Sequence, residues 1–321
     1  MPPVSNSTAT HIVFGAGQVG PVLARRLAAL GHDVVIVSRS GRGSGPGIRA
    51  VAGDALDAGF CASVARGAAV VYHCMNPRYE AATWEAQLPV IQRNLVAACG
   101  AAGARLVMLD NVYGLGRTGG MPMTEDTPAR PVSRKGAIRA RLADDLRAAH
   151  ARGEVRAVRG CASDFFGPGG TQTMFEQRFW TRVLAGKSAQ VLVNPDTPHT
   201  YHFIPDVAAG LAALGTADDH AYGTTWMLPC APAPTTRQLI DAFGRALDRD
   251  IAVSRLPRWL FATLKPFVPI FREFDEMLYQ WDEPFIVDDS RFRQQFGVIP
   301  TPLDEAARQT VAWAQKTFGR R

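Results

Sequence analysis

Short apolar runs alternate with amphipathic helical stretches over the first half of the chain. The runs are almost continuous in hydrophobic residues, as expected for strands that helices cover on both faces. They lie at His11–Phe14, Asp33–Ser38, Ile48–Val51, Ala69–Met75, Arg105–Asp110 and Val155–Arg159. Helical patterns fall between them at Gln18–Leu30, Thr83–Ala102 and Ser133–Ala151. This order predicts βαβ units and a doubly wound, parallel α/β sheet of the Rossmann type.

The pattern becomes less regular after Gly160, where loops rich in proline and glycine recur. We expect a smaller C-terminal α+β domain here, which binds substrate and closes over the edge of the sheet. The predicted boundaries give residues 1–165 and 200–230 to the dinucleotide-binding domain, and residues 166–199 and 231–321 to the substrate-binding domain. An aromatic segment of the second domain predicts either core or dimer packing or an apolar pocket wall; it contains Trp259, Phe261, Phe267, Phe271 and Trp281.

Composition narrows the class of protein. The 321 residues are 47% hydrophobic and 20% charged, which excludes a disordered chain. The net charge of +6 comes from scattered basic residues, which suit an anionic small molecule better than nucleic acid. No stretch is apolar enough to span a membrane or to form a signal peptide, so we expect a cytoplasmic protein. The five cysteines include no CxxC pair, which favours reduced thiols and no metal site.

The first apolar run leads into a glycine motif, Gly15-Ala-Gly17-Gln18-Val19-Gly20. The mechanics of this motif give Gly15 the tight turn, Gly17 the close approach of a pyrophosphate, and Gly20 the packing of helix on strand. The helix N-terminus then faces the phosphates. The motif predicts a dinucleotide site in which these three glycines, Gln18 and Val19 contact the cofactor.

The end of the second strand indicates which dinucleotide binds. Ser38, Arg39 and Ser40 occupy the place where an acidic residue would select NAD, and Arg39 offers a cation to a 2′-phosphate. This favours NADP, with NAD still possible if Arg39 only stacks on the adenine. Asp54 and Ala55 follow the third strand. Asp54 can accept a hydrogen bond from the adenine amino group, or it can cap the next helix.

Four later segments carry a family resemblance. They are Val112-Tyr113-Gly114, Asp164-Phe-Phe-Gly-Pro-Gly169, His202-Phe-Ile-Pro-Asp-Val-Ala208, and Val298–Leu303 with Thr310–Trp313. Together with the glycine motif they resemble the extended short-chain dehydrogenases, the NAD(P)-dependent epimerase/dehydratase group. The resemblance implies a homodimer that pairs the helices at 83–102 and 133–151. Cys74, Asn76 and Ser163 complete the residues predicted to contact the cofactor.

The usual catalytic residues of that group are missing. Its acid–base centre is a Tyr and a Lys in the pattern YxxxK, helped by an upstream Ser or Thr. The matching register places Lys135 at the Tyr position, Arg139 at the Lys position and Leu109 at the hydroxyl position. The chain therefore resembles the atypical members of the family.

Other residues are candidates to replace that centre. Asn111 can donate its amide to a substrate carbonyl, and Tyr113 can donate a proton. Lys135 either donates a proton, with a pKa lowered by Arg139, or binds the ribose or phosphate of the cofactor. Four polar residues are expected in loops that border the substrate cleft: Asp164, His199, Tyr201 and His202.

These observations predict an NADP(H)-dependent oxidoreductase or epimerase-like enzyme. It would act on a carbonyl, hydroxyl or enone group of a small organic substrate, with no nucleic acid, membrane or metal involved. The alternative is a non-catalytic protein that senses NADP(H) and regulates a partner.

Overall fold

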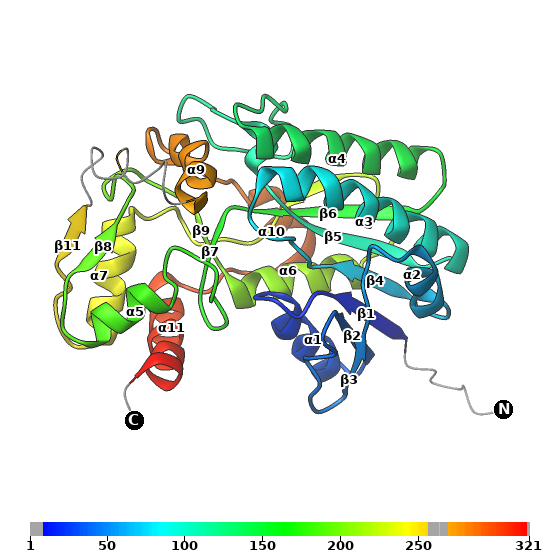
Figure 1. The fold of residues 1–321 in the computed structure, drawn as a ribbon, viewed down its shortest axis with the longest axis horizontal. Helices are drawn as coiled ribbons and strands as arrows, with labels where there is room; N and C mark the ends of the chain where they lie inside the picture. Colours follow the sequence, from blue (N-terminus) through cyan, green and yellow to red (C-terminus); the bar gives the residue numbers. More distant parts are fainter. Residues whose placement is uncertain (1–8, 256–262, 264–268, 320–321) are drawn as a thin grey trace.

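The computed structural model describes residues 9–255, 263 and 269–319. A seven-stranded sheet in the order β10-β6-β5-β4-β1-β2-β3 crosses the centre of the molecule (Figure 1). Every neighbouring pair is parallel. The strands are β1 (Thr10–Phe14), β2 (Asp33–Ser38), β3 (Ile48–Ala52), β4 (Val70–His73), β5 (Arg105–Asn111), β6 (Arg156–Ala162) and β10 (Thr225–Met227). The predicted fold class and six predicted strands are confirmed. Strand β10 was not predicted, because three residues are too few to show a pattern.

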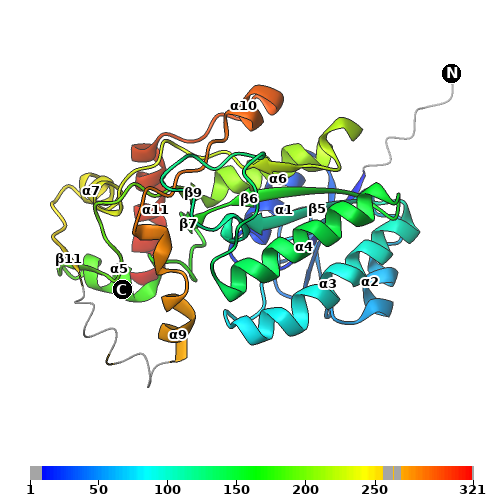
Figure 2. The same ribbon diagram turned by 90° about the horizontal axis from the view of Figure 1, so that it is seen from above.

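Helices cover both faces of this sheet (Figures 1 and 2). On one face lie α1 (Gly20–Ala29) and α6 (Ile204–Thr216), and on the other α2 (Ala58–Ala65), α3 (Ala81–Ala102) and α4 (Arg134–Ala151). The strand side chains alternate between the two cores: Val13 and Ile36 face α1, while Ile12 and Val35 face the opposite layer. This double cover explains why the strands are hydrophobic along their whole length.

A third hydrophobic cluster lies apart from the sheet. It joins α5 (Gln177–Leu184), α7 (Thr236–Ala246) and α11 (Leu303–Phe318), which lie together at the left of Figure 1. Two small parallel sheets accompany them: β7 (Asp164–Phe166) pairs with β9 (Tyr201–Phe203), and β8 (Ala189–Val191) pairs with β11 (Val253–Arg255). The predicted domain boundaries stay predictions, although this cluster supplies the second core that they require.

Two short segments connect the second core with the sheet. Helix α9 (Pro269–Asp275) and the 3-10 turn η3 (Leu278–Trp281) lie near the start of α3 and α4 (Figure 2), and α10 (Ser290–Phe296) packs against β10. In the predicted aromatic segment, Trp281 is buried in the third cluster. Trp259, Phe261 and Phe267 lie outside the described residues.

Candidate active site

The glycine motif turns the chain from β1 into α1 at the carboxyl edge of the sheet. Gly15 has φ +114°, and a Cβ there would meet the Cys74 carbonyl oxygen at 2.6 Å. A Cβ on Gly20 would lie 1.8 Å from the Gly15 carbonyl oxygen, so this glycine allows helix and turn to touch. A Cβ on Gly17 would contact nothing within 4 Å. Packing within the protein therefore demands Gly15 and Gly20, and leaves open space beside Gly17.

The start of α1 is suited to an anion. The helix begins at Gly20, two residues later than predicted, because Gly15 to Val19 form the loop. No side chain caps this N-terminus, so its first N–H groups face the loop without a side-chain acceptor. Gln18 accepts a hydrogen bond from the Gln172 N–H at 2.9 Å, which ties the loop to the segment after β7. These residues fit the diphosphate of a dinucleotide.

The end of β2 presents a free cation. Arg39 is exposed and forms no ion pair with the described residues, while the neighbouring Arg42 donates to the Ser40 hydroxyl at 2.9 Å. The Ser38 hydroxyl both accepts from the Arg42 N–H and donates to its carbonyl oxygen, which closes the turn after the strand. Arg39 is thus the basic side chain available to a ligand here.

Asp54 lies in the turn after β3. Its carboxylate accepts from the Leu56 N–H at 3.0 Å, and α2 is capped instead by Asp57, which accepts from the Phe60 N–H. The alternative in which Asp54 caps the helix is therefore wrong. The exposed Asp54 keeps acceptor capacity for a ligand, whereas the buried Ala55 uses its carbonyl oxygen for Asn94.

A buried charge network fixes the ends of β4 and β5. The Asp110 carboxylate, 4% exposed, accepts from Arg139 and from Arg159, each at 3.1 Å. Arg139 also donates to the Asn76 side chain at 2.9 Å, so the network holds Asn76 beside the strand ends. Cys74 lies between them and the glycine turn, and burial raises the pKa of its thiol to about 12. Arg139 thus serves Asp110 and Asn76 in this arrangement.

Asn111 and Tyr113 occupy the carboxyl end of β5. The Asn111 side-chain oxygen accepts from the Tyr113 N–H at 3.1 Å, which leaves the amide hydrogens as donors. The Tyr113 ring stacks on Trp84, and its hydroxyl interacts with that of Tyr79. Burial raises the pKa of Tyr113 well above its ordinary value, so the phenol stays protonated at neutral pH.

The Lys135 ammonium is fully buried near the start of α4. It donates to the Glu273 carboxylate, to the Glu273 carbonyl oxygen at 3.1 Å and to Glu276 at 2.7 Å. An ammonium has three hydrogens, and these three acceptors use all of them. It also lies 4.7 Å from the centre of the Tyr79 ring. Lys135 therefore binds α9 in this structure, while the proton-donor and cofactor-binding roles predicted for it stay predictions.

Ser163, His202, Asp164 and His199 meet where β6 ends. The Ser163 N–H donates to His202 Nδ1 at 3.0 Å, and His202 Nε2 lies 3.1 Å from the Leu228 carbonyl oxygen. Burial lowers the pKa of His202 to about 4, so this ring is neutral. Asp164 Oδ2 lies 2.8 Å from Nε2 of the fully buried His199. The structure thus joins three of the four predicted cleft residues in one cluster, and the fourth, Tyr201, packs on the His199 ring.

The comparisons with known proteins agree with this geometry. The family model described as "NAD dependent epimerase/dehydratase family" matches residues 12–226, about two thirds of the chain. This chain belongs to the NAD dependent epimerase/dehydratase family. It is therefore an NAD(P)-dependent enzyme of the extended short-chain dehydrogenase type, as the sequence motifs predicted. No curated protein among those compared matches its sequence.

Solved structures of epimerases and dehydratases share the fold. UDP-glucuronic acid 4-epimerase from Bacillus cereus, in complex with UDP-glucuronic acid and NAD, is 14% identical, with TM-score 0.77 over 96% of this chain and 99% of that one. The dTDP-glucose 4,6-dehydratase DesIV from Streptomyces venezuelae, with NAD and TYD bound, is 18% identical, with TM-score 0.77 over 97% and 98%. WbmH from Bordetella bronchiseptica, in complex with NAD⁺, is 18% identical, with TM-score 0.71 over 97% and 99%.

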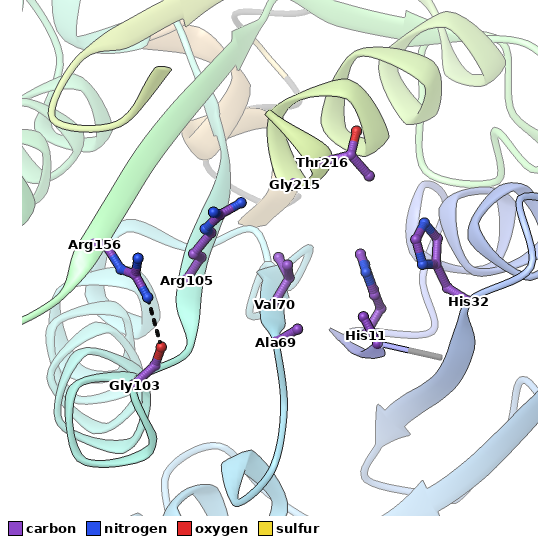
Figure 3. A pocket seen from close by; sticks show the side chains of 10 residues that line it. His11, His32, Ala69, Val70, Gly103, Arg105, Arg156, Gly215 and Thr216 are labelled. Carbon is purple, nitrogen blue, oxygen red and sulfur yellow. Dashed lines mark hydrogen bonds between the residues drawn. The ribbon is translucent and has the colours of Figure 1, made fainter. Parts of the chain in front are cut away.

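The open pocket of this epimerase/dehydratase family member in Figure 3 lies elsewhere. Its volume is about 440 Å³, and it is lined by the starts of β1, β4, β5 and β6, at the sheet edge opposite the glycine motif. Arg105 and Arg156 border it, but both contact Asp219, and Arg156 also donates to the Gly103 carbonyl oxygen. We assign no part of the dinucleotide site to this pocket.

Other surveys of the described residues are short. No helix among them is long and apolar enough to cross a membrane. No three His, Cys, Asp or Glu side chains within residues 9–255 and 269–319 come together as metal ligands would.

Several site residues of this family member escaped sequence analysis. Glu273 and Glu276, which bind Lys135, lie more than 130 residues after it, and no local pattern links them. Asp110 was visible only as the end of an apolar strand, although a carboxylate among hydrophobic residues is itself a sign of a buried ion pair. Tyr79 and Tyr279 had no motif around them.

Proposed function

We propose that this protein is an NADP(H)-dependent oxidoreductase or epimerase-like enzyme that acts on a carbonyl, hydroxyl or enone group of a small organic substrate. One observation carries the cofactor: the space beside Gly17 at the uncapped start of α1, where a Cβ would meet no protein atom. A glycine with ordinary φ and no close neighbour gives the fold nothing that alanine would not give. Its use is the close approach of a diphosphate.

The choice of NADP(H) rests on Arg39. This exposed guanidinium follows β2 and has no acidic partner among the described residues. Planar guanidinium groups bind phosphate through two hydrogen bonds, whereas the 2′-hydroxyl of NAD gives such a group no charge to pair with. The structures of the NAD-bound relatives support a nicotinamide dinucleotide of either kind.

Asn76, Asn111 and Ser163 line the same edge, at the ends of β4, β5 and β6. We propose that they hold the nicotinamide end and the reacting group of the substrate there. When bound, the nicotinamide gives or accepts a hydride. The Asn111 amide hydrogens suit a substrate oxygen on which negative charge develops. Tyr113, whose phenol keeps its proton, is placed to orient that substrate.

Substrate turnover tests the proposal. The purified chain is mixed with NADPH or NADP⁺ and a panel of UDP-glucuronic acid, UDP-glucose, dTDP-glucose, 2-cyclohexenone and aromatic ketones. Absorbance at the nicotinamide band and product analysis report the reaction, and a coenzyme titration reports binding. We expect coenzyme binding and turnover of at least one compound. Binding without turnover of any compound would favour the non-catalytic, coenzyme-sensing alternative. Failure of both coenzymes to bind would overturn both functions.

A further inference from the structure

The His199 imidazole has an oxygen atom opposite each ring nitrogen. Nε2 lies 2.8 Å from Asp164 Oδ2, and Nδ1 lies 3.4 Å from the carbonyl oxygen of Gln280. The ring is fully buried and lies nearly parallel to Trp281, at 4.5 Å between centroids, and to Phe285, at 5.2 Å. Packing therefore fixes the plane of the ring and the direction of both nitrogens.

Two protons are needed to satisfy these two contacts. The Gln280 carbonyl oxygen can only accept, so Nδ1 must carry a hydrogen. The contact between Nε2 and Asp164 needs a second hydrogen, which lies either on the imidazole or on the carboxyl group. The first case is an imidazolium with a carboxylate, and the second is a neutral ring with a carboxylic acid. In both cases the pair has no net charge and holds one proton more than a carboxylate beside a neutral imidazole.

Two other buried histidines of the same sheet edge behave differently. His73 Nδ1 accepts from the Met75 N–H at 3.2 Å, and His202 Nδ1 accepts from the Ser163 N–H at 3.0 Å. An N–H group fixes Nδ1 as an acceptor, so these two rings carry their hydrogen on Nε2. His199 alone among these three presents Nδ1 to an oxygen.

Asp164 connects this buried pair with the cleft. It directly follows Ser163, at the edge where Asn111 ends β5, and its side chain is 29% exposed. Phenol groups from separate segments surround it: the charge of Asp164 raises the pKa of each, after the larger effect of burial. The Tyr279 hydroxyl is buried and has no hydrogen-bond partner among the described residues, so a ligand oxygen beside Asp164 would find a donor there.

We propose that Asp164 and His199 together hold one transferable proton at neutral pH, and that Asp164 delivers it to the substrate oxygen when that oxygen gains charge. This inference rests on the proposed function, because the bound nicotinamide must supply the accompanying hydride. An O–H bond forms on the substrate, and the proton leaves the Asp164–His199 contact. The pair is left as a carboxylate with a neutral, Nδ1-protonated ring, and solvent reprotonates it through the exposed face of Asp164. In the oxidation direction the same pair accepts the proton.

This pair supplies the function for which no YxxxK tyrosine is present. The groups that face it come from five segments: Tyr79 before α3, Tyr113 in η1, Tyr201 and His202 in β9, Tyr279 in η3, and Ser163. Burial raises the pKa of the phenols, and it lowers the pKa of His202 to about 4. These neighbours are therefore neutral at pH 7, and the exchangeable proton belongs to Asp164 and His199.

Nitrogen NMR of the histidine rings tests the proton count without any substrate. Two-bond ¹H–¹⁵N spectra of the full chain at pH 7, with and without NADPH, distinguish protonated from bare ring nitrogens. The His199 signals are assigned by their loss in His199→Gln, or by their shift in Asp164→Asn if the first variant does not fold. We expect a hydrogen on Nδ1 of His199, and bare Nδ1 atoms in His73 and His202. A bare Nδ1 in His199 at pH 7 would overturn the proposal.

Kinetics of Asp164→Asn form the second arm. Asparagine can still donate to Nε2 but cannot release a proton, so we expect kcat for reduction to fall about 100-fold or more. The wild-type kcat/KM should decrease as the pair loses its proton at high pH, and this decrease should vanish in the variant. NADPH affinity should change by less than about threefold. The matched control is Asp196→Asn, at an exposed position paired with Arg237, which should keep the wild-type rate.

The two arms separate failure of this inference from failure of the proposed function. A chain that binds NADPH but turns over nothing can still show the Nδ1-protonated ring, which would remove the enzyme but keep the proton-holding pair. An active chain whose Asp164→Asn variant keeps its rate and pH profile would keep the enzyme and overturn the role of Asp164.

Discussion

The side chain of Glu273 accepts a hydrogen bond from Lys135 and, at 2.9 Å, another from the Ala81 N–H at the start of α3. One carboxylate on α9 therefore joins the first turns of two helices that cover the sheet. Burial alone would raise the pKa of Glu273, but the hydrogen bonds from Lys135 and Ala81 lower it overall. The residue found at the position of the family's tyrosine thus closes the second half of the chain onto the first.

Replacing Lys135 by methionine should destabilise the protein without abolishing coenzyme binding. Methionine fills the space but leaves Glu273 and Glu276 facing each other without a cation. Loss of one partner of a buried ion pair costs 3–5 kcal/mol. Because both carboxylates are about a quarter exposed, we expect about 2 kcal/mol, or a decrease in Tm of about 4 °C. Thermal unfolding and an NADPH titration measure the two effects.

The matched control for that variant is Lys187→Met, at an exposed position without an ion pair to the described residues. Its Tm should stay within about 1–2 °C of the wild type. An unchanged Tm together with lost NADPH binding in Lys135→Met would instead support the cofactor-binding role predicted for Lys135 from the sequence.

Alanine at Gly17 and at Gly20 should produce opposite defects. Gly17 does not have a positive φ, and its added Cβ meets no protein atom, so Gly17→Ala should fold with an unchanged Tm. The methyl group would occupy the space for the diphosphate and weaken coenzyme binding at least tenfold, about 1.4 kcal/mol. Gly20→Ala should lower the Tm, because its Cβ would lie 1.8 Å from a backbone oxygen. Tight coenzyme binding by Gly17→Ala would show that the diphosphate lies elsewhere.

The sequence predicted the parts of this site that local patterns determine. Strands covered on both faces are continuous apolar runs, so β1 to β6 were visible before the structure was known. The glycine motif needs only a strand before it and a helix after it. Arg39 was found because the end of β2 has a fixed relation to the motif.

Contacts between distant segments were not visible in the same way. Lys135 was placed correctly at the start of a helix, but its partners Glu273 and Glu276 belong to a segment that packs there only in the folded chain. His199 and Asp164 are 35 residues apart, and their contact depends on the pairing of β7 with β9. The orientation of the His199 ring depends further on Trp281 and Phe285. Such geometry follows from tertiary packing, which no periodicity reports.

Changing Arg39 to aspartate should reverse the coenzyme preference. The guanidinium is exposed at the end of β2 and has no acidic partner among the described residues, so the change should leave the Tm close to that of the wild type. A carboxylate would repel a 2′-phosphate and accept a hydrogen bond from a 2′-hydroxyl. We expect the ratio of the Kd values for NADPH and NADH to change by about 100-fold, roughly 2.7 kcal/mol.

The control for this change is Arg49→Asp, at an exposed position in the neighbouring strand β3. It alters the net charge by the same amount and should leave the ratio of the two Kd values unchanged. If both variants shift the ratio equally, the preference comes from overall charge, and Arg39 has no direct contact with the coenzyme.

The stability of the protein should depend on pH through His73. Burial, followed by the nearby Arg139, lowers the pKa of this histidine to about 4 in the folded chain, against about 6.5 when unfolded. Between these values the unfolded state binds a proton that the folded state does not. The stability contributed by the neutral ring is therefore complete above pH 6.5, and it is lost as the pH falls toward 4. One such group changes the free energy of unfolding by about 1.4 kcal/mol per pH unit.

His73→Gln isolates this contribution. Glutamine keeps an acceptor for the Met75 N–H but binds no proton, so the free energy of unfolding should fall less steeply with acid in the variant. Between pH 6 and 4.5 we expect the two slopes to differ by about 1.4 kcal/mol per pH unit, measured by urea denaturation at closely spaced pH values. Above pH 7 the two curves should run parallel, because neither state of the wild type is protonated at His73. Equal slopes in acid would mean that the folded protein accepts the charge on His73, most directly by sharing it with Asp110 across the buried arginine network.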